Sequence, residues 1–203
     1  MPVITDITTQ KRAQTRYSIY LDNTYSFSLT DLELSTSGLR VGQSLTADEV
    51  LQWQQQSVDG KAYQAALRYL GYRPRSRREV HDQLVRKDYE AAVIERTLER
   101  LEEHGLIDDR AFAEAWVASR QALKPRSRYV LEQELAQKGV AREVAQATVA
   151  DIGASGHQQM LDAVIAKKRK QVRYQDPKVL MEYLARQGFK YDQIKEALSR
   201  LDD

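Results

Sequence analysis

Apolar and polar residues alternate along the start of the chain, which is the pattern of β-strands with one buried face. The alternation is clear in Tyr17–Leu21 and again in Tyr25–Leu29, and the turn-prone segment Asp22–Thr24 joins the two runs. Two alternating runs joined in this way predict a β-hairpin. Val3–Ile7 is expected to add a third strand. Because an isolated hairpin is marginal in water, this β region, residues 1–45, should pack on a helical part of the chain.

The remainder of the chain has helical character. Thr46 and Glu49 form a capping-box sequence, which predicts a connecting helix over 46–60 that starts at Thr46. Three prolines follow, at positions 74, 125 and 177. Since proline disrupts a helix interior, each is expected to mark a boundary between helices.

A segment of about 50 residues recurs three times in this helical part. Arg73–Arg77 recurs as Lys124–Arg128, displaced by 51 residues, and a further displacement of 49 residues reaches a third copy. The apolar positions that align over the three copies are Val80, Leu131 and Leu180; Leu84, Leu135 and Leu184; Leu98, Val149 and Leu198; and Leu101, Ile152 and Leu201.

Each copy is predicted to fold as three helices. The predicted fold is therefore mainly α, with three tandem three-helix repeats that form an elongated, curved array, preceded by a small N-terminal β-hairpin or sheet. The expected helices run over about 61–72, 77–87 and 90–104 in repeat 1 (61–107), 109–122, 127–138 and 141–152 in repeat 2 (108–155), and 157–173, 177–187 and 190–201 in repeat 3 (156–203).

Capping residues support this division at the second helix of each repeat. Ser76 with Glu79 gives a capping box in repeat 1, and Asp176 stands at the equivalent N-cap of repeat 3. Helices commonly end on a residue in the left-handed conformation, usually glycine. The position expected to take that conformation holds Asp88, Gly139 and Gly188 in repeats 1, 2 and 3.

Composition limits the class of protein. The 203 residues are 42% hydrophobic and 30% charged with a net charge of +2, which is enough apolar content for a folded core. The chain has no cysteine, which removes disulfides and thiolate chemistry. No apolar run approaches the roughly 20 residues that span a bilayer, and the start lacks the pattern of a signal peptide. We therefore expect a soluble, cytosolic protein with no membrane partner.

Sequence motifs for catalysis are absent. The nine glycines are scattered and form neither GxxxxGK[ST] nor GxGxxG. His81, His104 and His157 lie far apart, and none has a second histidine at a metal-ligand spacing. We expect a protein that is not an enzyme and that uses no cofactor and no metal.

Basic residues gather near the first interhelical turn of each repeat, with tyrosines interleaved. One interpretation is a solvated charged surface over a tyrosine-covered core. The other is a discontinuous positive band that meets phosphates or an acidic protein groove. The candidate contact residues are Arg68, Arg73, Arg75, Arg77 and Arg78 in repeat 1, Lys124, Arg126 and Arg128 in repeat 2, where Arg120 also belongs to the cluster, and Lys167, Lys168, Arg169, Lys170 and Arg173 in repeat 3.

A second conspicuous group follows at the start of repeat 2. Asp108 and Asp109 are adjacent, so on a helix they point about 100° apart and are poorly placed for shared acid–base work. They are expected instead to cap the helix that follows. Phe112 and Trp116 are four residues apart, on one helical face, and are expected to belong to the core.

Several of these motifs resemble the RecX family of regulators. The resemblance lies in Ala66–Leu70, Arg75–Val80, Leu106–Val117 and Leu135–Gly139, and covers about residues 61–201. The segment LIDDRAFAEAWV is its most specific part. The N-terminal sheet resembles, more loosely, an extension that some longer members carry.

The resemblance implies tandem three-helix repeats and a protein partner. RecX proteins bind the RecA recombinase and its filament on single-stranded DNA, lodge in the filament groove, and restrain its ATPase, growth and strand exchange. We therefore expect a monomeric inhibitor of RecA, which contacts several RecA protomers at once. The alternative is a direct DNA-binding protein whose helical repeats use the basic band on the phosphates of single- or double-stranded DNA.

Overall fold

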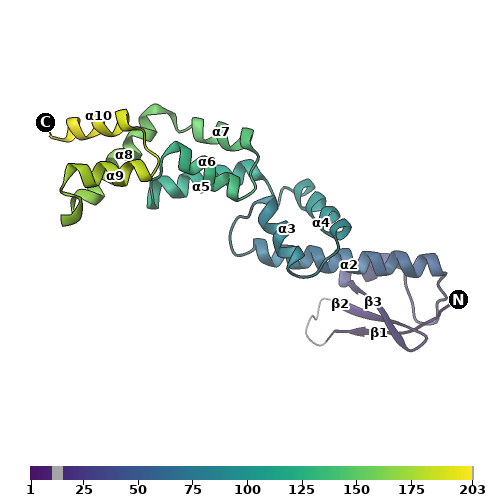
Figure 1. Cartoon of the computed structure of the whole chain (residues 1–203). Coiled ribbons are helices and arrows are strands. Elements are labelled where there is room, and N and C mark those ends of the chain that lie inside the picture. The colour runs from purple at the N-terminus through teal and green to yellow at the C-terminus, as the bar shows by residue number, and fades with distance from the viewer. Residues whose placement is uncertain (11–15, 203) are drawn as a thin grey trace. The chain divides into compact units, whose positions relative to one another are not determined.

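The structure is a computed structural model that describes residues 1–10 and 16–202, with side chains to residue 200 (Figure 1). Asp203 and the side chain of Leu201, the last aligned position of the repeat, lie outside the described residues. The chain divides into two compact units. Unit 1 comprises residues 1–73 and 81–104, and unit 2 comprises residues 74–80 and 105–203.

Unit 1 begins with the predicted sheet. Strands β1 (Ile4–Thr9), β2 (Arg16–Leu21) and β3 (Thr24–Thr30) are antiparallel in the order β1-β2-β3. Asp22 and Asn23 take positive φ angles of 47° and 65°, as a tight two-residue hairpin turn requires. The hairpin and the third strand are thus confirmed.

The sheet buries one face against helices of the same unit. Its core contains Ile4, Ile19, Phe27 and Leu29, and the ring of Trp53 stacks on Phe27 with the centroids 6.2 Å apart. Helix α1 (Asp31–Ser37), which the sequence analysis did not predict, follows β3 directly and starts at a capping box.

Helix α2 (Ala47–Leu70) is continuous. The expected connecting helix and the first helix of repeat 1 are therefore one element, which starts at the predicted capping box of Thr46 and Glu49. Small residues on α2 let α1 and the sheet approach closely: a Cβ on Gly60 would lie 3.2 Å from Glu33 Oε1 in α1 and 3.5 Å from Arg16 Nη1 in β2. Ser57 Oγ accepts a hydrogen bond from the backbone N–H of Ser28 in β3, at 3.0 Å.

The other predicted helices are confirmed within a few residues. They are α3 (Arg77–Val85), α4 (Ala91–Glu103), α5 (Asp109–Leu123), α6 (Arg128–Gln137), α7 (Arg142–Ala150), α8 (Gly153–Arg169), α9 (Pro177–Arg186) and α10 (Tyr191–Asp202), with a short 3-10 turn, η1 (Val172–Tyr174), before α9.

Among the residues that the structure describes, unit 2 contains one apolar core in repeat 2 and another in repeat 3. Leu131 and Leu135 lie in the first, and their aligned residues Leu180 and Leu184 lie in the second. The residues that align in the sequence repeat therefore occupy equivalent buried positions in the two cores. The fold is mainly helical, with tandem three-helix domains after a small antiparallel sheet, as expected; the exact domain boundaries stay predictions.

The predicted left-handed helix ends are confirmed. Asp88, Gly139 and Gly188 have φ angles of 59°, 83° and 82°. No helix in the described part of the chain is long and apolar enough to cross a membrane.

Candidate interaction surface

The basic clusters of repeats 1 and 2 surround a buried serine that starts the second helix of each repeat. Ser76 accepts a hydrogen bond from the backbone N–H of Glu79 at 3.2 Å, and Ser127 accepts one from Val130 at 3.3 Å. Both serines are almost inaccessible to solvent. The serine in the middle of each basic motif is therefore a buried helix cap, which has a structural role.

A first set of contacts joins the start of α3 to the end of α6. Ser76 Oγ donates to the carbonyl oxygen of Lys138 at 2.6 Å, and Lys138 Nζ pairs with Glu79 Oε1 at 2.7 Å. Gly139 lies so close to Arg78 that a Cβ there would overlap the arginine side chain. We call Ser76, Arg78, Glu79, Lys138 and Gly139 the first clasp.

A second set of contacts joins the equivalent positions of the next pair of repeats, at the start of α6 and the end of α9. Arg126 donates from Nη1 to the side-chain oxygen of Gln187. A Cβ on Gly188 would lie 2.5 Å from Ser127 Oγ and 3.1 Å from Val130 Cγ2. We call Arg126, Ser127, Val130, Gln187 and Gly188 the second clasp.

The carboxylate of Glu134 collects three groups of repeat 2. Trp116 Nε1 donates to Glu134 Oε2 at 2.9 Å, and Arg120 Nε donates to the same oxygen at 2.6 Å. Arg126 Nε lies 3.9 Å from Oε1. Two cations contact the Trp116 ring, with the Arg120 guanidinium 4.5 Å and Lys138 Nζ 5.2 Å from its centroid. Arg120, Arg126 and Lys138 are therefore held by contacts within the protein.

Asp108 has the predicted capping role, whereas Asp109 lies in the first turn of α5, as expected, but its side chain accepts from another helix. Asp108 accepts from the backbone N–H groups of Arg110 and Ala111 at 2.8 and 3.1 Å. Asp109 Oδ1 accepts from the backbone N–H of Arg77 at 2.8 Å, which ties α5 to the start of α3. Phe112 is buried, while Trp116 is half-buried at the edge of the core.

The candidate contact residues differ in exposure. Arg126 is mostly buried in the second clasp, and the Arg128 guanidinium pairs with Glu132 at 2.9 Å. Arg68 and Arg73 belong to unit 1 and the other candidates to unit 2, so the discontinuous positive band over the three repeats stays a prediction. The exposed candidates are Arg68, Arg73, Arg78, Lys124, Arg128, Lys167, Lys170 and Arg173, and the half-buried ones are Arg75, Arg77, Arg126, Lys168 and Arg169.

Repeat 3 has a cation–aromatic group of its own. Lys168 Nζ lies 4.8 Å from the ring centroid of Tyr174 and 4.5 Å from that of Tyr183. The two rings are 5.1 Å apart and tilted by 59°. Arg169 and Tyr174 line a neighbouring pocket of about 300 Å³.

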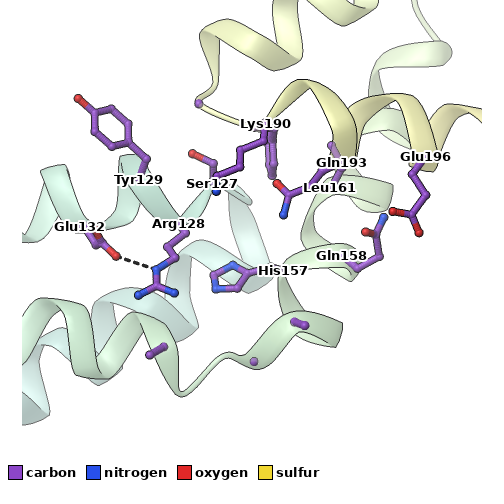
Figure 2. A pocket seen from close by; sticks show the side chains of 15 residues that line it. Ser127, Arg128, Tyr129, Glu132, His157, Gln158, Leu161, Lys190, Gln193 and Glu196 are labelled. Atoms are coloured by element: carbon purple, nitrogen blue, oxygen red, sulfur yellow. Dashed lines mark hydrogen bonds and ion pairs between the residues drawn. The ribbon is translucent and has the colours of Figure 1, made fainter.

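Unit 2 also contains a cleft of about 640 Å³ between repeats 2 and 3, with charged and apolar side chains in its lining (Figure 2). Arg128 and Glu132 line it from α6, His157 from α8 and Glu196 from α10. Burial lowers the pKa of His157 below its usual 6.5, with a smaller lowering from the Arg128 charge. His157 Nε2 lies 3.3 Å from the carbonyl oxygen of Val149.

Sequence reasoning missed Glu134, Lys138 and Gln187. The alignment of Leu135–Val140 with Leu184–Phe189 contained the last two, but it does not indicate what they contact. In the described residues, no group of three or more His, Cys, Asp or Glu side chains is placed to hold a metal ion.

Three segments match known domain families. Residues 2–46 match the regulatory protein RecX N-terminal domain, residues 62–101 the RecX first three-helix domain, and residues 108–149 the RecX second three-helix domain.

Curated relatives named regulatory protein RecX match most of the chain. The protein of Chlorobium phaeobacteroides is 40% identical over 145 residues, which are 70% of this chain and 95% of the relative. That of Bacillus licheniformis is 31% identical over 206 residues, all of this chain and 78% of the relative. That of Halalkalibacterium halodurans is 35% identical over 83% of this chain, which spans 65% of the relative's length.

Solved structures share the fold. A crystal structure of a regulatory protein RecX matches with a TM-score of 0.78 over 98% of this chain and all of that chain, at 24% identity. The RecX of Lactobacillus salivarius matches with a TM-score of 0.63 over 71% of this chain and 97% of the other, at 26% identity.

Proposed function

The chain belongs to the RecX family, and from that premise we propose that it is a non-enzymatic regulator of the RecA recombinase. In this proposal the protein acts in the cytoplasm as a monomer. It binds the RecA filament on single-stranded DNA and restrains its ATPase, growth and strand exchange. Family membership over the whole chain is the observation that carries the proposal.

We assign the contact with the filament to the exposed cations of the three clusters. Lys124, Lys167 and Lys170 are exposed in repeats 2 and 3. Lysines on an exposed surface act as point charges toward an acidic protein groove or a phosphate backbone. Arg126 is assigned a different role, because its guanidinium is engaged by Gln187 and Glu134 within the protein.

Charge reversal tests this assignment. The triple variant Lys124→Glu, Lys167→Glu, Lys170→Glu is expected to lose about tenfold or more in inhibition of the DNA-dependent ATPase of RecA, because attraction becomes repulsion. The matched control reverses three exposed cations outside the clusters: Arg40→Glu, Lys87→Glu, Lys195→Glu. If both triples inhibit RecA equally well, the assignment is wrong.

Direct DNA binding is the second candidate, and the group around Lys168 favours it. Tyrosine rings beside lysine and arginine side chains are typical of surfaces on which single-stranded bases stack. If this group binds DNA, Tyr174→Ala weakens the binding of a fluorescent oligonucleotide, whereas Tyr191→Ala, at an exposed tyrosine outside the group, does not. Affinity should also fall steeply with salt. Equal affinities of the two variants would remove this candidate site.

A further inference from the structure

The two clasps of unit 2 join equivalent positions of successive repeats, although the individual contacts differ. In each, the residues around a serine N-cap touch the residues that end the second helix of the next repeat. Ser76 reaches Lys138, 62 residues later, and Arg126 reaches Gln187, 61 residues later. The repeated basic motif therefore contributes to repeat stacking in addition to carrying charge.

Glycine makes the close approach in each clasp possible. Gly188 is in the left-handed conformation, and its missing Cβ leaves the space in which Ser127 Oγ and Val130 Cγ2 lie. Any side chain there would force the end of α9 away from the start of α6. The contact of Gly188 with Ser127 and Val130 therefore sets how closely repeats 2 and 3 approach each other.

The clasps are not interchangeable. The first holds the Glu79–Lys138 ion pair, whereas the second has Val130 and Gln187 at the aligned positions. Placing Lys138 against Val130 would leave a half-buried cation without its carboxylate, which is costly. The start of each second helix therefore fits the end of the second helix in the following repeat better than it would fit the other one. This difference favours the correct pairing of two similar surfaces.

We infer that the second clasp is a positioning device, which fixes the spacing between the basic residues of repeat 2 and those of repeat 3 that a partner contacts. The inference rests on the proposed function. A ligand with several contacts binds well only when they are engaged together, so an altered spacing weakens binding without removing any contact residue. Gln187 and Gly188 act through the arrangement of the repeats and need not touch the partner.

The test compares two glycine substitutions. Gly188→Ala meets Ser127, whereas Gly153→Ala, the matched control, carries similar left-handed strain at a φ of 68° and meets nothing within 4 Å. Because the chain has no cysteine, spin labels can be attached at Ala147→Cys in α7 and Glu182→Cys in α9, both exposed. Distance distributions between the labels report the spacing directly, and circular dichroism confirms that each variant is folded.

We expect Gly188→Ala to shift or broaden the distance distribution and to weaken inhibition of RecA about tenfold, while Gly153→Ala keeps the wild-type values. Gln187→Ala, which removes the hydrogen bond between Arg126 and Gln187 without changing a glycine, should act in the same direction. A wild-type distribution in both Gly188→Ala and Gln187→Ala would overturn the inference, as would a changed distribution with unchanged inhibition. If the wild-type protein has no effect on RecA, the proposed function is wrong, and the distances still decide whether the clasp sets the spacing.

Discussion

At the scale of single residues, Glu134 organises the basic side chains of repeat 2. Its carboxylate accepts hydrogen bonds from Trp116 and Arg120 and lies near Arg126. Its side chain is only 19% exposed, so these charges interact in an environment that water screens weakly. A cluster that looks purely cationic in the sequence is therefore partly neutralised in the fold.

Replacing Glu134 tests that role. Glu134→Gln keeps the shape of the side chain but removes its charge, and is expected to lower the free energy of unfolding by about 1.5–3 kcal/mol. Glu132→Gln is the control, because Glu132 pairs with the half-exposed Arg128 and should cost about 0.5 kcal/mol or less. Urea unfolding of both variants measures the difference. Equal losses would contradict the role given to Glu134.

His157 should make stability depend on pH. Since burial lowers its pKa in the folded state, the unfolded chain binds the proton more readily. The free energy of unfolding is then unaffected by this group above its ordinary pKa of 6.5, and falls as the pH drops below that value. His157→Gln should lose less stability than the wild type between about pH 7.5 and about pH 5.5. Parallel losses in the two proteins would contradict this.

At the scale of elements, the second helix of every repeat ends in the same backbone conformation, although the residue type differs. Asp88, Gly139 and Gly188 all adopt the left-handed conformation that the sequence alignment predicted. Gly139 and Gly188 must also be glycine because of the clasps, which depend on contacts some 60 residues away and could not be derived from local pattern. For the same reason Lys138 and Gln187 could not be identified as contact residues.

Exchanging the residue types at positions 88 and 139, which both have positive φ angles, should change the stability in opposite directions. Asp88→Gly relieves the left-handed strain of a residue with a Cβ and is expected to raise the free energy of unfolding by about 0.5 kcal/mol. Gly139→Asp introduces that strain and a collision with Arg78, and should lower it by more than about 1 kcal/mol. Thermal unfolding compares them, and a stabilised Gly139→Asp would contradict the first clasp.

At the scale of the whole molecule, the register of the repeats was predictable because buried leucines recur with it. Leu131 and Leu180, and Leu135 and Leu184, occupy equivalent places in two cores. The continuity of α2 through Gly60 was not predictable, since this glycine is explained only by the side chains of Glu33 in α1 and Arg16 in β2 that lie against it. The cations of the candidate site could be predicted from the sequence. Which of them are exposed, and which are bound to other side chains as Arg126 is, depends on the fold.

The central claim is regulation of RecA, and the most direct measurement is the single-strand-dependent ATPase of RecA with this protein titrated in. A parallel titration of the same DNA without RecA, at two salt concentrations, measures direct DNA binding. We expect inhibition at concentrations well below those at which bare DNA is bound. Inhibition that begins only when the DNA itself is covered would contradict this expectation, and would identify a competitor for DNA instead of a filament regulator.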